Sequence, residues 1–91
     1  MISARNSGMM QNMKAKVMQF NVIFRPEAEG GFTAVVPSLP GCISYGKTLP
    51  QAKDMIQDAI SGYLASLKKH RQKISSDEGS FVTLLSVGQY A

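Results

Sequence analysis

Apolar and polar residues alternate over residues 17–24, and this period of two predicts a β-strand. Its even-numbered positions form one fully apolar face, made of Met18, Phe20, Val22 and Phe24. The proline and glycine of the next segment, residues 25–30, interrupt the alternation as a hairpin connection does. A second apolar run at residues 32–36 therefore predicts a second strand.

A corner follows the second strand at the sequence Pro37-Ser38-Leu39-Pro40-Gly41. Pro37 and Pro40 have no amide hydrogen to donate to a strand ladder, and Gly41 can adopt backbone angles that other residues avoid. The chain is therefore predicted to leave the sheet here and to return in a third strand at residues 42–45.

The segment after Gly46 has the strongest helical signal in the chain. Thr48 and Gln51 have the spacing of a capping box, in which each side chain bonds a backbone amide left free at the start of a helix. Pro50 falls in the first turn, where its missing amide hydrogen costs little. We expect the helix to begin directly after Thr48.

Apolar residues then recur at helical spacing on one face of this segment. They are Ala52, Met55, Ile56, Ala59, Ile60, Tyr63, Leu64 and Leu67. Gly62 lies in the helix interior, where glycine costs about 1 kcal/mol relative to alanine, and this suggests close packing against the sheet or a neighbour. The helix is predicted to end between His70 and Ser75.

Residues 75–80 are polar and predict a linker, and the apolar residues of 81–87 predict a final strand. The order β-β-β-α-β predicts an α+β fold in which one helix packs on one face of a small sheet. Because residues 1–12 show no period, they are expected to be a disordered leader, before a single domain at residues 13–87 and a short tail at residues 88–91.

The composition indicates a small globular protein. Its 91 residues leave room for one domain, and such a domain buries only about 60–65% of the surface that its unfolded chain exposes, so a homo-oligomer, a dimer or larger, is expected. No apolar run is long enough to cross a membrane. Cys42 is the single cysteine, which excludes an intramolecular disulfide, and the N-terminus lacks the apolar core of a secretion signal. A cytoplasmic location is expected.

Much of the net charge of +4 comes from a basic group made of Lys68, Lys69, Arg71 and Lys73. A basic surface attracts the phosphates of nucleic acids, so these residues are candidates for a weak nucleic-acid-binding site. They also lie where the helix is predicted to end, and cations there stabilise the helix dipole by about 0.3–1 kcal/mol each. The dipole interpretation is favoured over the binding site.

No set of residues predicts an active site. Cys42 and His70 are the only candidates for a thiol-imidazole pair, and nothing in the sequence brings them together. Asp54 and Asp58 are four residues apart on the predicted helix, but the neighbouring Lys53 favours a solvated helix face over a metal site. We expect no enzymatic activity, no metal and no cofactor, and the sequence favours a binding function.

Leu39, Ile43 and Tyr45 lie near the proline-glycine corner and allow two interpretations. In the first, these side chains pack over the edge of the sheet. In the second, they form an apolar surface that faces a partner protein. The sequence favours neither, so the three residues are candidates for partner binding.

The segments over residues 17–87 together resemble the N-terminal domain of the HicB-like antitoxins. The resemblance rests on Gly-Gly-Phe before the second strand, on Val-Val-Pro-Ser-Leu-Pro-Gly-Cys at the corner, and on Gly46-Lys47-Thr48 before the helix. It implies a partial ribonuclease-H-like sheet, homo-oligomerisation, and binding to a small HicA-type toxin that cleaves messenger RNA. Complete members usually append a DNA-binding domain. The four residues after Val87 leave no space for one, so DNA binding is not expected.

The resemblance therefore implies an antitoxin that binds and sterically neutralises a HicA-type toxin. Ser38 and Lys47 stand where the family often carries acidic residues, and the loss of negative charge weakens the expected attraction to a basic toxin. Two alternatives stay open. One is a weak nucleic-acid-binding module that uses the basic group at the helix end, and the other is a stand-alone homo-oligomer with no toxin partner.

Overall fold

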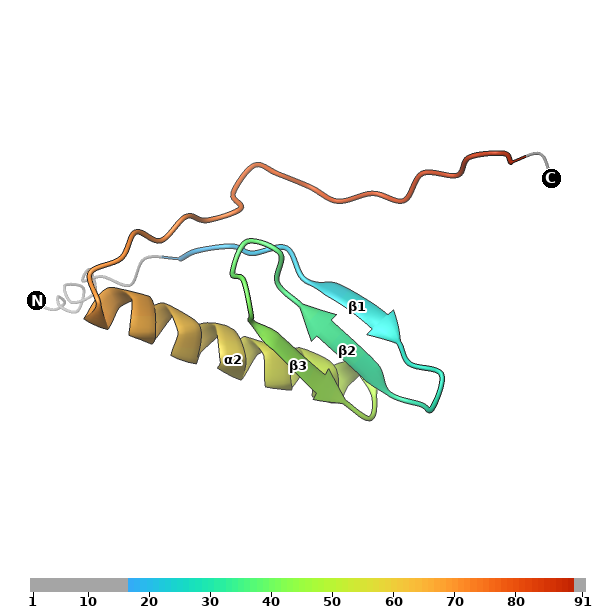
Figure 1. The fold of residues 1–91 in the computed structure, drawn as a ribbon, viewed down its shortest axis with the longest axis horizontal. Coiled ribbons are helices and arrows are strands. Elements are labelled where there is room, and N and C mark those ends of the chain that lie inside the picture. Colours follow the sequence, from blue (N-terminus) through green and yellow to red (C-terminus); the bar gives the residue numbers. More distant parts are fainter. Residues whose placement is uncertain (1–16, 90–91) are drawn as a thin grey trace, which may run out of the picture.

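A computed structural model describes residues 17–89 of the chain. In order, it contains the strands β1 (Ile23–Pro26), β2 (Phe32–Val35) and β3 (Ile43–Gly46), and then the helix α2 (Leu49–Lys69) (Figure 1). The predicted α+β class, with a small sheet and one helix on one face, is confirmed. The predicted leader at residues 1–12 and the last two residues of the predicted tail lie outside the described residues.

The three strands form an antiparallel sheet in the order β1-β2-β3. In its register, Ile23 lies opposite Val35, and Val35 lies opposite Ile43. The β1-β2 hairpin closes through the amide of Glu27, which donates to the carbonyl of Gly31 at 2.9 Å. This sheet leaves two open edges, one along β1 and one along β3.

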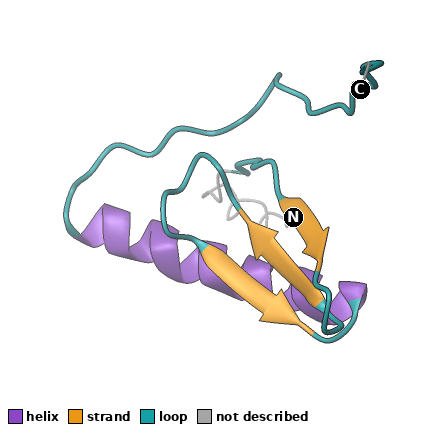
Figure 2. Ribbon diagram, turned by 45° about the vertical axis from the view of Figure 1, so that its right-hand side comes forward, coloured by secondary structure: helices purple, strands orange, loops and turns teal. Residues whose placement is uncertain are grey.

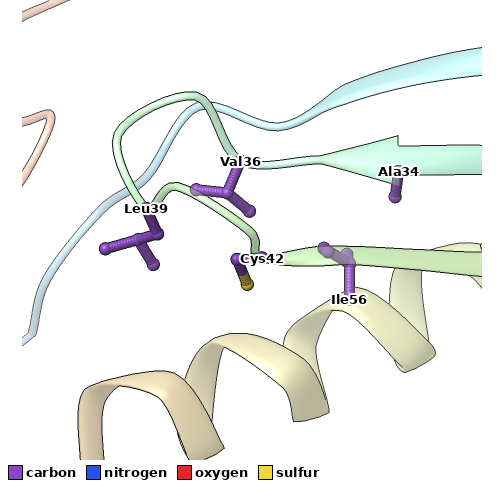
Figure 3. Packing of buried hydrophobic residues seen from close by; sticks show 5 residues of the cluster. All are labelled: Ala34, Val36, Leu39, Cys42 and Ile56. Atoms are coloured by element: carbon purple, nitrogen blue, oxygen red, sulfur yellow. The ribbon is translucent and has the colours of Figure 1, made fainter. Parts of the chain in front are cut away.

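Helix α2 packs against β3 and β2 and leaves the inner face of β1 less covered (Figure 2). The core lies between helix and sheet, where buried side chains from β2, the corner, the start of β3 and α2 meet (Figure 3). Its fully buried members are Ala34, Val36, Leu39, Cys42, Ala52 and Ile56. The core is small and is concentrated at one side of the sheet.

The predicted start of the helix is confirmed. Thr48 is the N-cap, and its hydroxyl accepts a hydrogen bond from the amide of Gln51 at 3.2 Å. The side chain of Gln51 completes the motif on the residue before the cap, since its oxygen accepts from the amide of Lys47. Pro50 lies in the first turn as predicted.

The helix ends at Lys69, slightly before the predicted range, and His70 is its C-cap. Arg71 follows in the left-handed conformation with φ of 55°, and its amide donates to the carbonyl of Lys68 at 3.0 Å. The amide of Gln72 donates to the carbonyl of Leu67 at 2.8 Å, which completes a Schellman motif. The helix therefore has defined caps at both ends.

Two details of the predicted elements are corrected. The first strand begins only at Ile23, which lies opposite Val35 at the end of β2; before it, the amides of Gln19 and Asn21 bond the side chains of Ser76 and Asp77. Gly62, expected to pack against the sheet or a neighbour, does not contact the sheet: it is exposed in the single chain, and a Cβ atom added there meets nothing within 4 Å.

The final strand predicted at residues 81–87 is not formed within the described chain. These residues run away from the helix and sheet in both views, as the orange to red trace in Figure 1. The linker before them makes a turn in which the amide of Ser80 donates to the carbonyl of Asp77 at 3.0 Å, with Gly79 at a φ of 86°. This turn directs the chain away from β1, so the segment finds no strand to pair with.

Candidate protein-binding surface

The proline-glycine corner is a closed loop that connects β2 to β3. The amide of Val36 donates to the carbonyl of Cys42 at 3.1 Å, and the amide of Cys42 donates to the carbonyl of Leu39 at 2.9 Å. The hydroxyl of Tyr63 donates to the carbonyl of Pro40 at 2.8 Å and so ties the corner to α2. These bonds fix the position at which β3 enters the sheet.

The structure separates the three candidate residues at this corner. Leu39 is only 3% exposed and points into the core, so the packing interpretation holds for this residue (Figure 3). Ile43 and Tyr45 are 56% and 49% exposed. Ser44, between them, donates its hydroxyl to the carbonyl of Met55 in α2, and strand side chains alternate between faces, so both lie on the face away from the helix.

This face of the sheet is called the outer face below. One row across it contains Ile23, Val35 and Ile43, which are aligned directly by the register of the three strands. A second row contains Arg25, Thr33 and Tyr45. The outer face therefore presents a β-branched apolar row beside a polar and aromatic row, with no helix over it (Figure 2).

Tyr45 is held in place on the outer face. Its hydroxyl donates to the carbonyl of Gly30 at 2.9 Å, and its ring occupies the space that a side chain at Gly31 would need. Gly31 has a φ of 82°, which also favours glycine. An exposed aromatic ring whose orientation is already fixed loses little conformational entropy when it binds.

A second apolar surface lies between α2 and the uncovered inner side of β1. We call it the flank groove, and the hollow beside β1 has a volume of about 330 Å³. Its walls are formed by Phe20, Val22 and Phe24 on one side and by Lys53, Ile56, Gln57 and Ile60 on the other. The sequence indicated the apolar side chains of this groove by their alternation, but gave no sign that the helix would leave them partly open.

A cluster of hydrogen bonds fastens the linker to the segment before β1. The carboxylate of Asp77 accepts from the hydroxyl of Ser38 at 2.6 Å and from the amide of Asn21 at 2.9 Å, and both bonds lower its pKa. The amide of Asp77 also donates to the carbonyl of Gln19. We call this cluster the Asp77 anchor. No motif in the sequence indicated it, because its members are far apart along the chain.

The basic residues lie at the far end of α2. Lys68 and Lys69 are in its last turn, and Arg71 and Lys73 follow the C-cap; all four are exposed. Cations in this position complement the negative end of the helix dipole. Their role in nucleic-acid binding stays a prediction.

The structure does not bring the potentially reactive residues together into a site. Cys42 is buried in the core, and burial raises the pKa of its thiol. His70 is exposed at the helix end, where its Nδ1 atom lies 2.8 Å from the carbonyl oxygen of Ser66. Among residues 17–89, no three or more His, Cys, Asp or Glu residues gather in a way that could hold a metal ion.

Within the same residues, no helix has both the length and the apolar character needed to span a bilayer.

Comparison with known proteins agrees with the resemblance. Residues 20–86 match the family described as the HicB-like antitoxin of bacterial toxin-antitoxin systems. A UPF0150 protein of Thermoplasma acidophilum is 40% identical over 67 residues, which cover 74% of this chain and 97% of the relative. UPF0150 proteins of Synechocystis and Helicobacter pylori are each 31% identical, over 74% and 77% of this chain and 92% and 96% of their own lengths.

Proposed function

This chain belongs to the HicB-like antitoxin family, and we propose that it acts by binding a HicA-type toxin and covering the surface with which the toxin engages RNA. The proposal requires no catalysis by this chain. It places the protein in the cytoplasm, where messenger RNA is cleaved. The observation that carries it is the outer face, an exposed apolar sheet surface in a protein of an antitoxin family.

The outer face has the properties of a protein-binding surface. Ile23 and Ile43 are 39% and 56% exposed in one continuous row, and the ring of Tyr45 stands beside them. Aromatic anchors next to aliphatic contacts are common centres of binding energy in protein interfaces. A flat β surface can cover a broad part of a small toxin without entering its active site.

The test is to express the toxin with wild-type protein and with Tyr45→Ala, and to measure complex affinity and messenger RNA cleavage. Loss of a central aromatic anchor costs about 2 kcal/mol, so the variant should bind roughly thirtyfold more weakly. Tyr45→Phe is the matched control. It loses the bond to the carbonyl of Gly30 but keeps the ring, and it should bind almost as well as wild type.

Thermal unfolding of each variant must accompany the affinity measurement, because the Tyr45 ring also packs over Gly31. If Tyr45→Ala folds and still binds and protects like wild type, the outer face is not the toxin-binding surface. If wild type neither binds nor protects, this chain is not an antitoxin for the toxin tested.

A further inference from the structure

The C-terminal segment carries an unusual amount of exposed apolar surface. We call residues 81–87 the arm. Phe81, Leu84 and Val87 are 83%, 97% and 85% exposed, and the other apolar members, Val82 and Leu85, are 62% and 83% exposed. Single exposed apolar residues are ordinary, but five within seven consecutive positions form a contiguous patch that calls for a partner.

The base of the arm is fixed, but no other part of the described chain buries the arm itself. The Asp77 anchor holds the linker beside Gln19 and Asn21, directly before β1. The turn that ends at Ser80 then redirects the chain outward. Every residue from 80 to 89 is exposed as a consequence.

The chain also contains a surface that an extended apolar strand would complete. The amides of Gln19 and Asn21 point to the open edge of the sheet along β1, where they bond the linker. Because backbone groups alternate along a strand, those of Ile23 and Arg25 point to the same edge, beyond the reach of the linker. The flank groove lies directly beneath this edge, beside Phe24.

The arm matches this edge in length and in pattern. Seven extended residues span about 23 Å at roughly 3.3 Å per residue, which is more than the length of β1. Its two faces are both mainly apolar, as is typical of strands covered on both sides. One face would fill the flank groove, and the other would extend the apolar row of the outer face beyond Ile23.

We propose that the arm of one chain adds as a strand to the β1 edge of a second copy and fills that copy's flank groove, and that the second copy's arm does the same in return. The turn between Asp77 and Ser80 leads each arm away from its own β1, so the exchange places it on the neighbour. The result is a two-fold symmetric dimer in which every sheet has a fourth strand.

The test compares the full-length protein with two variants, by light scattering over a range of micromolar concentrations. Leu84→Asp/Leu85→Asp should weaken dimerisation at least about a hundredfold, because whichever of the two residues faces the flank groove would bury a charge in each of the two chains. Both leucines are exposed in the single chain, so the helical circular dichroism signal should persist. Ile43→Asp is the control: it places a charge at an exposed apolar residue on the β3 side and should leave the dimer intact.

Nuclear Overhauser contacts in a mixture of isotope-labelled and unlabelled chains distinguish an arm that binds the second copy from an arm that folds back on its own β1. Contacts between the methyl groups of labelled Leu84 or Leu85 and the ring of unlabelled Phe20 are expected. Contacts found only within one chain would show that the arm closes on its own β1 and would overturn the proposal. The proposal would also be overturned if the wild-type protein stays monomeric. It would be overturned as well if Ile43→Asp dissociates the dimer and the arm variant does not. No toxin is present in these experiments, so their outcome is independent of the proposed function.

Discussion

Gly46 lies where the end of β3 meets the first turn of α2. A Cβ atom at this position would overlap the backbone nitrogen of Ala52 and lie 2.6 Å from its Cα atom. Neither atom belongs to a flexible side chain, so the helix itself would have to shift. The absence of a side chain at Gly46 therefore sets how closely helix and sheet approach.

Gly46→Ala should lower the free energy of unfolding by about 1–3 kcal/mol, the usual cost of overpacking a well-packed site. Gly62→Ala is the matched substitution, since nothing lies within 4 Å of its added Cβ atom and alanine is favoured in a helix interior by about 1 kcal/mol. It should raise the free energy of unfolding. Urea unfolding of both variants measures these two changes in the free energy of unfolding. Equal effects of the same sign would contradict this account of helix packing.

Asp77 makes the attachment of the linker depend on pH. Hydrogen bonds from the Ser38 hydroxyl and the Asn21 amide lower the pKa of its carboxyl in the folded protein. A carboxyl whose pKa is lowered on folding stabilises the folded protein fully at pH values above its pKa in the unfolded chain, which is near 3.9. This stabilisation is lost as the pH falls through the lower pKa of the folded protein. The linker should therefore stay attached at neutral pH and loosen only in acid.

Asp77→Asn should remove this dependence. At neutral pH we expect faster exchange of the Asn21 amide in the variant, with little change in the helix. Between about pH 5 and pH 2, the protection of this amide should fall in the wild type and stay constant in the variant. Exchange followed residue by residue provides the measurement. Unchanged protection of Asn21 in the variant would show that the carboxylate does not hold the linker.

The elements differ in how far the surrounding sequence determines them. The hairpin, the corner and the helix start were predictable because turn residues and caps act within a few positions of the residues they control, as Thr48 and Gln51 do. The short β1 was not, because its start depends on where its partner β2 ends, and the segment before it bonds a linker more than fifty residues away. The place of Leu39 in the core was also open, since its burial depends on how α2 crosses the corner.

The arm shows the same limit for a different reason. Its apolar pattern indicates a strand, but a strand also needs an edge to pair with, and local pattern does not specify which chain supplies that edge. The outer face illustrates this at the candidate site as well. The sequence named Ile43 and Tyr45, but their alignment with Ile23 and Val35 comes from the register alone.

Tyr63 links two elements, because its hydroxyl bonds the corner from the middle of α2. Tyr63→Phe removes only this bond and keeps the ring in the core. It should lower the free energy of unfolding by about 0.5–1.5 kcal/mol, the net value of a typical hydrogen bond. Amide exchange at Cys42 should become faster, while exchange in the first turn of α2 stays unchanged. Equal acceleration in both places would mean that the whole domain, and not the corner, had been loosened.

At the scale of the whole molecule, the positive charge is uneven. Four of the ten basic residues lie within or just beyond the last turn of α2, at one end of the domain. Within residues 64–74 no Phe, Tyr or Trp lies between them, and the one ring there, that of His70, lies with its Nδ1 atom 2.8 Å from the carbonyl oxygen of Ser66. We expect attraction to nucleic acid through charge alone.

Binding to single-stranded RNA should therefore be weak and should fall with salt, with a slope of log affinity against log salt no steeper than about −3 for four phosphate contacts. Fluorescence anisotropy at several salt concentrations measures this slope. Replacing Lys68, Lys69 and Arg71 together by glutamine should abolish the binding and leave toxin neutralisation unchanged. Submicromolar affinity at physiological salt would instead favour a nucleic-acid-binding function.

The outer face and the flank groove lie on opposite faces of the sheet, and the exposed residues of the outer face are richest along β3, the edge farthest from β1. A toxin bound over Ile43 and Tyr45 and a second copy bound along β1 therefore claim different surfaces. Neither ligand competes with the other. If both proposals hold, one assembly contains two antitoxin chains and two toxin molecules, with each arm beside a toxin-binding face and not beneath it.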